Sequence, residues 1–380
     1  MKLKSKLPNV GTTIFTKMTH LSNTHNAINL SQGFPDFDVH PELIHLVEKY
    51  MRNGFNQYAP MQGVLPLREK IVQKVKKIYD KTCDIDTEIT ITSGATEALF
   101  AAITAFVHAG DEVIVFDPAY DSYEPVIELC GGKPVHLKLI HPEYAIDWDQ
   151  VNKHLSLKTK LLILNSPHNP TGSVLGRDDI VQLKQIIDTH DIHILSDEVY
   201  EHIIFDGREH ESILKYPELA AKSFVVSSFG KTYHATGWKI GYCIAPEDMT
   251  EEFRKIHQYL TFSSNTAVQY AYADFLDHEK AYLELSEFYQ KKRDLFVSKL
   301  KHSRFRVIPS HGTYFQLLDY SDITRMPDTE FSRQLTIEHK VASIPPSVFY
   351  KTNDDHHVLR FCFAKRDETL EAAAVKLCAI

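Results

Sequence analysis

The feature that most constrains the fold is an alternation of short apolar runs with longer amphipathic runs in the middle of the chain. The apolar runs are predicted to be strands, at residues 89–92, 113–116, 135–139, 161–164, 192–195, 224–227 and 240–244. Helical patterns lie between several of them, for example at residues 96–108 and 178–189. Continuously apolar strands are buried on both faces, so this order predicts an α/β fold with a mostly parallel seven-stranded sheet between helices.

The pattern changes past about residue 280. The elements predicted there are a long polar helix, three short strands and a closing helix, at residues 280–301, 305–308, 313–318, 358–363 and from 367. The first 40 residues also lack the strand–helix alternation. We therefore expect a large α/β domain over residues 41–280 and a smaller α+β domain formed by residues 1–40 and 281–380.

Charge and composition argue against several classes of protein. The formal net charge of −8 disfavours nucleic acid and anionic membranes as partners. No apolar stretch approaches the roughly 18–20 residues that cross a bilayer. The five cysteines are scattered without Cys-x-x-Cys spacing, which suits a reducing cytoplasm. His-Glu-x-x-His is also absent, so we expect no disulfide framework and no metal site.

A lysine just after a predicted strand is the strongest candidate for chemistry. Lys231 lies in Ser-Ser-Phe-Gly-Lys-Thr-Tyr-His-Ala-Thr-Gly-Trp-Lys, whose last residue is a second cation, Lys239. Burial and a neighbouring cation both disfavour an ammonium ion, and Schiff-base chemistry requires a deprotonated amine. A nucleotide phosphate loop would need a glycine where Val225 stands, so that interpretation is rejected. An exposed lysine in a turn remains the alternative.

Two polar motifs follow predicted strands, at the edge where α/β sheets bind ligands. Ser93-Gly94-Ala95-Thr96 begins a helix, and its free backbone amides favour a phosphate. An ordinary helix cap by Thr96 is the alternative. Asn169, in Asn-Pro-Thr-Gly, offers both a donor and an acceptor to a ligand, although this motif is also a common turn.

Two charged side chains are predicted within or beside buried strands. Asp197 ends the run Ile-His-Ile-Leu-Ser-Asp and needs a cation or a strong donor there. Tyr200, three residues on, points into the same space if a helical turn begins at that point. Arg360 shares a strand face with Val358 and is expected to be half-buried against a carboxylate. For both charges a structural ion pair within the protein is the alternative to a ligand.

Taken together, these motifs resemble the pyridoxal-phosphate-dependent class I aminotransferases, which have the aspartate aminotransferase fold (fold type I). The resemblance extends from about Asn29 to the C-terminus. At residues 29–37, 57–60, 196–202 and 228–239 the sequence is most similar to those of bacterial methionine aminotransferases, and next to those of kynurenine/glutamine aminotransferases.

The resemblance implies that pyridoxal 5'-phosphate forms a Schiff base with Lys231, which later shuttles the proton. Asp197 would pair with the pyridine nitrogen and make the ring an electron sink. The remaining implied cofactor contacts are Gly94, Ala95, Thr96, Tyr120, Asn169, Tyr200, Ser228, Lys239 and Tyr58 of the partner subunit. Lys239 stands where the family often has arginine, so the charge is kept but the bidentate fork is lost.

The implied substrate contacts are Asn169, Arg360, the Gly33 backbone, Phe15 and Phe262 of the partner subunit. We expect a homodimeric aminotransferase that takes an uncharged amino acid, with methionine favoured over aromatic amino acids, glutamine or kynurenine, and a 2-oxo acid. No motif offers a second arginine for a distal carboxylate, so aspartate should be a poor donor. A pyridoxal-phosphate-dependent β-lyase of cysteine conjugates is the alternative. A regulatory protein with this fold is disfavoured because Lys231 and Asp197 are both present.

Overall fold

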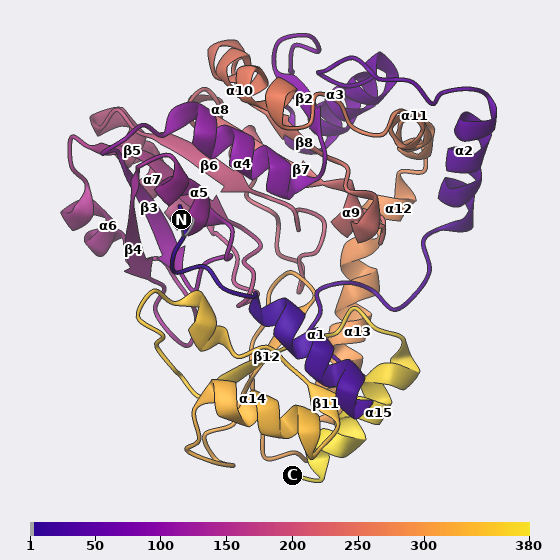
Figure 1. Ribbon diagram of the computed structural model, residues 1–380, viewed down its shortest axis with the longest axis vertical. Coiled ribbons are helices and arrows are strands. Elements are labelled where there is room, and N and C mark those ends of the chain that lie inside the picture. The colour runs from indigo at the N-terminus through magenta and orange to yellow at the C-terminus, as the bar shows by residue number, and fades with distance from the viewer. Residues whose placement is uncertain (1–3) are drawn as a thin grey trace.

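The large sheet contains the seven predicted strands. The structure is a computed structural model that describes residues 4–380 (Figure 1). The strands are β2 (Ile89–Thr92), β3 (Glu112–Asp117), β4 (Lys133–Lys138), β5 (Thr159–Asn165), β6 (His193–Asp197), β7 (Ser223–Ser228) and β8 (Gly241–Ile244). Their order is β2-β8-β7-β6-β5-β3-β4, and within these residues β8 runs antiparallel to both neighbours while the other neighbouring strands are parallel. The predicted mostly parallel α/β sheet is confirmed.

Helices cover both faces of this sheet because both sets of alternating strand side chains are apolar. One face packs against α4 (Ala95–Phe106), α5 (Tyr123–Leu129) and α10 (Glu247–Leu260). The opposite face packs against α3 (Leu65–Tyr79), α6 (Trp148–His154), α7 (Arg177–Thr189), α8 (Pro217–Ala220) and α11 (Thr266–Phe275). On that side α2 (Pro41–Arg52) packs against α11. The carboxyl ends of the parallel strands therefore remain open for a site.

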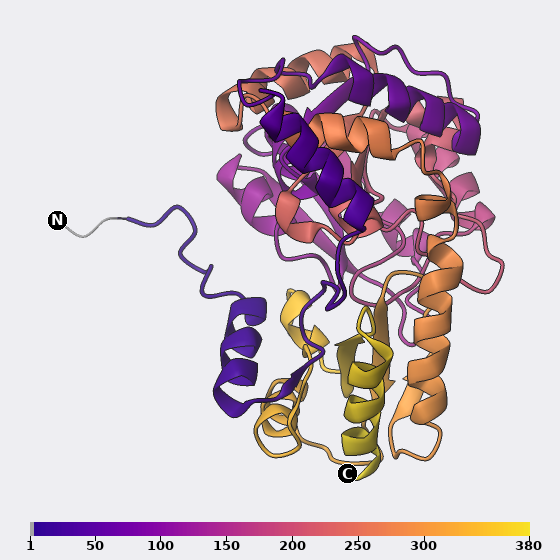
Figure 2. The same ribbon diagram turned by 90° about the vertical axis from the view of Figure 1, so that its right-hand side faces the viewer.

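Two small sheets form a second core. β9 (Arg306–Ile308), β10 (Phe315–Asp319) and β12 (Val358–Cys362) make an antiparallel sheet with β10 in the middle, close to the predicted strands. β1 (Ile28–Asn29) pairs in parallel with β11 (Val341–Ala342), a two-residue ladder that the sequence pattern does not reveal. The helices of this part are α1 (Ile14–His25), α13 (Leu285–Lys299), α14 (Asp328–Ile337) and α15 (Asp367–Cys378), which gather below the large sheet in Figures 1 and 2.

The single long helix predicted at residues 280–301 is wrong in one respect. The chain forms α12 (Lys280–Leu283) and then α13, with Glu284 between them at φ −89° and ψ 0°. Tyr282, before the break, is buried in the core of the large sheet, whereas Leu285, after it, is buried in the second core. The interruption lies where the chain passes from one core to the other, and it lets both side chains be buried.

The N-terminal segment packs with the second core. α1 contacts α14 and β11, and Met18 of α1 is buried with Ile344 and Phe349. The division into a domain of residues 41–280 and a domain of residues 1–40 with 281–380 stays a prediction. Short helical segments complete the fold: α9 (Phe229–Thr232), η1 (Ile213–Lys215), η2 (Thr236–Trp238) and η3 (Pro346–Phe349). Among residues 4–380 no helix is both long and apolar enough to cross a membrane.

Candidate active site

A cavity of about 200 Å³ opens at the carboxyl ends of the parallel strands. Ten of the residues predicted from the sequence line it: Gly94, Ala95, Thr96, Tyr120, Asn169, Asp197, Tyr200, Ser228, Lys231 and Lys239. They come from the start of α4, the loops after β3, β5 and β6, the ends of β6 and β7, and the segment that follows β7. The topology thus gathers residues that are widely spaced in the sequence.

The amine of Lys231 has a lowered pKa. It lies on the single turn of α9, directly after β7. Burial lowers the pKa of Lys231 to about 8, since a desolvated ammonium ion is disfavoured, and nearby Arg360 and Lys239 act in the same direction. Its Nζ donates hydrogen bonds to the hydroxyl of Tyr314 (2.9 Å) and to the carbonyl of Gly33 (3.2 Å). The alternative of an exposed lysine in a turn is therefore wrong.

Asp197 is a buried carboxyl whose partner is a tyrosine. The hydroxyl of Tyr123 donates to its Oδ2 (2.6 Å), and the amide of Val199 donates to its Oδ1 (3.3 Å). No lysine, arginine or histidine of residues 4–380 forms an ion pair with Asp197. The predicted alternative of a structural ion pair at Asp197 is therefore wrong. Burial raises the pKa of Asp197 to about 6, and the Tyr123 hydrogen bond opposes that rise. A cationic ligand in the cavity would therefore find a carboxylate that no cation of residues 4–380 pairs with.

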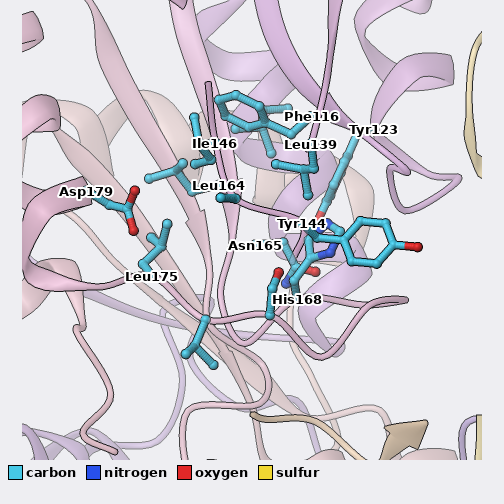
Figure 3. Close-up of a pocket in the computed structure, with 14 residues that line it drawn as sticks. Phe116, Tyr123, Leu139, Tyr144, Ile146, Leu164, Asn165, His168, Leu175 and Asp179 are labelled. Atoms are coloured by element: carbon cyan, nitrogen blue, oxygen red, sulfur yellow. The ribbon is translucent and has the colours of Figure 1, made fainter. Parts of the chain in front are cut away.

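Tyr123, the partner of Asp197, also contributes to a second cavity. It lines a neighbouring cavity of about 40 Å³ together with Asn165 and largely apolar side chains such as Phe116 and Leu139 (Figure 3). Asn165 lines both cavities. Its Nδ2 donates to the backbone carbonyl of Asp197 (2.9 Å), and its Oδ1 accepts from the amide of Asn169 (2.8 Å). Asn165 therefore ties the loop after β5 to the end of β6.

Arg360 is fully buried, not half-buried as expected, because both faces of β12 are covered. Its Nη1 donates to Oδ1 of Asn169 (2.7 Å) and its Nη2 to the carbonyl of Ser31 (2.9 Å), with Phe315 packed 4.0 Å from Cζ. No Asp or Glu oxygen of residues 4–380 lies within 4.0 Å of this guanidinium, so the alternative of a protein carboxylate partner is wrong. Burial lowers the pKa of Arg360 to about 10.

The start of α4 forms a cradle for an anion. Gly94 is the N-cap residue, with φ +81° and no capping side chain, so the predicted alternative of a cap by Thr96 is wrong. The first amides of α4 consequently have no side-chain acceptor at the cap. A Cβ on Gly94 would meet Cε of Lys239 at 3.3 Å, which shows how closely this cation lies over the helix start. Lys239 holds that place with a left-handed backbone, at φ 54°.

Five predicted residues do not line the cavity. Tyr58 and Phe262 lie on the surface in mutual contact, with ring centroids 5.6 Å apart and exposed fractions of 86% and 45%. Phe15 lies 5.4 Å from Cζ of Arg360. Gly33 faces Lys231 through its carbonyl oxygen, which is not the group that would bind a substrate carboxylate. Arg360, the fifth, reaches the site through Asn169.

Three residues with evident roles were missed. Asn165 was not singled out, although its place directly after the predicted strand 161–164 is a usable signal. Tyr123 lies three residues after the predicted Tyr120, with the ring centroids 5.7 Å apart, and this closeness in sequence is also a usable signal. Tyr314 directly precedes β10, and no local sequence motif indicates a role for it.

The fold and these side chains define an enzyme site with a reactive amine, a buried carboxyl and an anion cradle. The family model described as "Aminotransferase class I and II" matches residues 25–377, and the chain belongs to this family. It is an aminotransferase with fold type I, an enzyme that moves an amino group between an amino acid and a 2-oxo acid.

The chain is similar to particular aminotransferases over its whole length. It is 52% identical to the methionine aminotransferase of Escherichia coli K12, over 98% of this chain and 97% of that protein. The solved structure of YbdL from Escherichia coli, described as having a methionine aminotransferase function, matches with a TM-score of 0.98 and 51% identity and covers 100% of both chains. A kynurenine–oxoglutarate transaminase of Dictyostelium discoideum is 33% identical over 96% of this chain and 93% of that protein. The predicted resemblance is confirmed.

Proposed function

We propose that this aminotransferase uses pyridoxal 5'-phosphate on Lys231 to move the amino group of an uncharged amino acid, methionine foremost, to a 2-oxo acid. The observation that carries the proposal is the meeting of three groups in one cavity. These are an amine with a pKa of about 8, a carboxyl without a cationic partner, and the uncapped start of α4 under Lys239. A cofactor with an aldehyde, a pyridine nitrogen and a phosphate matches them one to one.

The residues present fit this cofactor. The amides of Gly94, Ala95 and Thr96 would hold the phosphate, because a helix N-terminus favours an anion, with Ser228 and Lys239 beside it. Asp197 would accept a hydrogen bond from the pyridinium, which supplies the cation that this carboxyl lacks. Once bound, the cofactor supplies an electron-withdrawing ring that stabilises negative charge on the substrate α-carbon.

The other lining residues would set the position of the ring and of the phenolic oxygen. Tyr120 lines the cavity from the loop after β3 and offers its ring for stacking. Tyr200 and Asn169 would hydrogen-bond the phenolic oxygen. Asn169 is prepared for this because Arg360 already occupies its Oδ1, which leaves Nδ2 as a donor.

Arg360 would bind the substrate α-carboxylate. Its guanidinium is buried and has no protein carboxylate within reach among residues 4–380, and its Nε has no hydrogen-bond partner there. A substrate carboxylate would supply the missing anion, because charge-assisted bidentate pairs are the strongest ones available to arginine. Phe15 beside Arg360, and Phe262 of the partner subunit, would then enclose an apolar side chain such as that of methionine.

Lys231 would act as the base once its amine is free. Its pKa of about 8 means that the neutral amine is accessible near neutral pH at a cost of about 1.4 kcal/mol per unit. The nitrogen Nζ would take the proton from the substrate α-carbon. It would then return the proton to another atom on the same face of the bound substrate.

Further parts of the proposal concern the whole protein. We propose a homodimer in which Tyr58 and Phe262 serve the site of the other subunit, since both are exposed and lie outside their own cavity. We also propose a cytoplasmic location, which suits five cysteines that are all free in the structure. The two-domain division given above belongs to the same proposal.

A transamination screen tests the substrate class. We expect kcat/KM for methionine or phenylalanine to exceed that for aspartate by at least about a hundredfold, or roughly 2.7 kcal/mol, because a second carboxylate would lose hydration without gaining a cation. Arg360→Ala should lower kcat/KM for all donors by similar factors, whereas Arg306→Ala, which removes an exposed arginine, should not.

Two outcomes of the screen would contradict the proposal. Equal values for aspartate and methionine would show that an unrecognised cation lines the substrate pocket. Release of pyruvate and ammonia from a cysteine conjugate without any acceptor acid, at a rate above transamination, would assign β-elimination instead.

A further inference from the structure

Tyr314 is a buried residue at the site that the proposed function does not use. It directly precedes β10 and is fully buried. Its ring packs against those of Tyr200 and Tyr289, at centroid distances of 5.1 Å and 5.6 Å. Its hydroxyl donates to the carbonyl of Gly33 (2.5 Å) and lies 2.9 Å from Nζ of Lys231.

The direction of these hydrogen bonds is fixed by chemistry. A carbonyl oxygen cannot donate, so the only hydroxyl proton of Tyr314 points to Gly33. Toward Lys231 the Tyr314 oxygen can therefore only accept. The Gly33 carbonyl also accepts from Lys231, at 3.2 Å. The two acceptors thus lie side by side on one side of the amine.

This arrangement matters for an amine that must take up a proton. A neutral primary amine has two N–H bonds and one lone pair. Tyr314 and Gly33 provide one acceptor for each N–H bond, and they are the hydrogen-bond partners of Nζ within residues 4–380. The lone pair consequently has no protein donor and remains available. The same contacts restrain a long, flexible side chain whose rotamer freedom otherwise works against a defined position.

The two acceptors are themselves held in place. Gly33 approaches so closely that a Cβ there would lie 2.8 Å from Cζ of Phe315, so a larger residue would push the carbonyl away. The neighbouring carbonyls of its segment accept from Arg360 at Ser31 (2.9 Å) and from Lys365 at Phe34 (2.7 Å). The aromatic rings around Tyr314 fix its hydroxyl from the other side.

We propose that Tyr314 is a positioning residue for the Lys231 amine: with the Gly33 carbonyl it occupies the two N–H bonds of the neutral amine and leaves its lone pair free for the substrate proton. This inference rests on the proposed function, in which Lys231 is the reacting amine. It assigns to Tyr314 an effect on the proton-transfer step and not on substrate binding.

The test compares Tyr314→Phe with Tyr289→Phe in the full-length protein. Tyr289 is a matched control because it is equally buried, packs against Tyr314, and has a hydroxyl without a hydrogen-bond partner in residues 4–380. The first measurement is the single-turnover rate with methionine as a function of its concentration. The second is trace acetylation of Lys231 against pH in cofactor-free protein, quantified by mass spectrometry.

For Tyr314→Phe we expect a maximal rate lower by at least about tenfold, or 1.4 kcal/mol, with half-saturation by methionine changed less than about threefold. The pH midpoint of Lys231 acetylation should fall, since the ammonium form loses an acceptor. Tyr289→Phe should change neither. A 3-fluorotyrosine at position 314 keeps the ring and hydroxyl but weakens the acceptor, so it should move the midpoint in the same direction even if Tyr314→Phe folds poorly.

An unchanged acetylation midpoint in both position-314 variants would overturn the inference. A changed midpoint with an unchanged single-turnover rate would also overturn it, because the contact would then be structural. Failure of the proposed function is distinguishable, since cofactor attachment to another lysine would be seen in the unmodified protein.

Discussion

At the scale of single residues, Asp197 illustrates how a site is maintained at a cost to stability. Its carboxyl has a pKa of about 6 against an ordinary value of 3.8, because burial disfavours the carboxylate. The ionised form is therefore less favourable in the folded chain than in the unfolded chain. This destabilisation is fully present above about pH 6 and disappears as the pH falls below the ordinary value.

Asp197→Asn should consequently stabilise the cofactor-free protein at pH 8. The rise in the pKa from 3.8 to about 6 corresponds to at most about 3 kcal/mol, and the gain should vanish as the pH falls below 3.8. The measurement is the free energy of unfolding in urea at several pH values. Asp206→Asn is a control of opposite sign, since Arg293 lowers the pKa of Asp206 and that pair stabilises at pH 8. A stability loss for Asp197→Asn that does not vary with pH would show that the carboxylate is not strained.

The site depends on contacts between distant residues, and this limits what the sequence reveals. Lys231, Asp197 and Asn169 were predictable because each follows an apolar run and carries a recognisable chemical group. Tyr314 was not, because its partner lies 83 residues away and its own surroundings are ordinary aromatic sequence. Tyr123 had only its place near Tyr120 as a signal, and its partner Asp197 lies 74 residues away. Arg360 was predicted as a carboxylate binder, but its full burial follows from the covering of both strand faces, which one strand pattern does not show.

At the scale of elements, the start of α4 explains why a glycine stands at position 94. Gly94 has φ +81° and ψ 168°, a conformation essentially restricted to glycine, and its missing Cβ leaves room for Lys239. The cradle is thus built from the start of one helix and from one lysine with a left-handed backbone conformation, and both depend on local backbone geometry.

Gly94→Ala should therefore weaken cofactor binding. Backbone strain of about 1–3 kcal/mol is expected. The Lys239 side chain should also be displaced, because its Cε would lie 3.3 Å from the new Cβ. Gly110→Ala is a matched control, because Gly110 also has a positive φ of 91°, but among residues 4–380 no atom lies within 4 Å of the position that its Cβ would take. Both variants should lose stability, but only Gly94→Ala should raise the Kd for pyridoxal phosphate, by at least about tenfold. Equal cofactor affinities by fluorescence titration would exclude the cradle.

The elements also separate what was predictable from what was not. The seven strands of the large sheet were found because buried parallel strands are continuously apolar. The β1–β11 ladder was missed because two residues are too few to form a pattern. The break at Glu284 was missed because it depends on which core each side of the helix meets, and that is a property of the whole fold.

At the scale of the whole molecule, the site draws on segments from both predicted domains. Lys231 and Asp197 come from the large sheet, whereas Gly33, Tyr314 and Arg360 come from the segments expected to form the smaller domain. Tyr58 and Phe262 lie together on the surface of the same chain, away from its cavity. In the homodimer that we propose, these aromatic rings serve the site of the other subunit.

Mixing two impaired variants tests this arrangement. Tyr58→Phe should weaken cofactor binding and Lys231→Ala should abolish turnover. If the two residues serve one site from different subunits, a mixed dimer contains one doubly altered site and one intact site, so activity should rise on mixing. In the control mixture, Tyr259→Phe, which alters another exposed tyrosine, replaces Tyr58→Phe. No rise, with subunit exchange shown by mass spectrometry, would place Tyr58 and Lys231 in the site of the same chain.

The central claim is that Lys231 is the amine that carries the cofactor, and borohydride reduction tests it most directly. The protein loaded with pyridoxal phosphate should absorb in the visible range, and borohydride should abolish that absorption and fix the cofactor to one peptide. We predict that mass spectrometry finds the modification on Lys231, whose pKa of about 8 and place in the cavity, with Nζ hydrogen-bonded to Tyr314, favour attachment. Modification of Lys239 or of any other lysine in place of Lys231 would contradict the account.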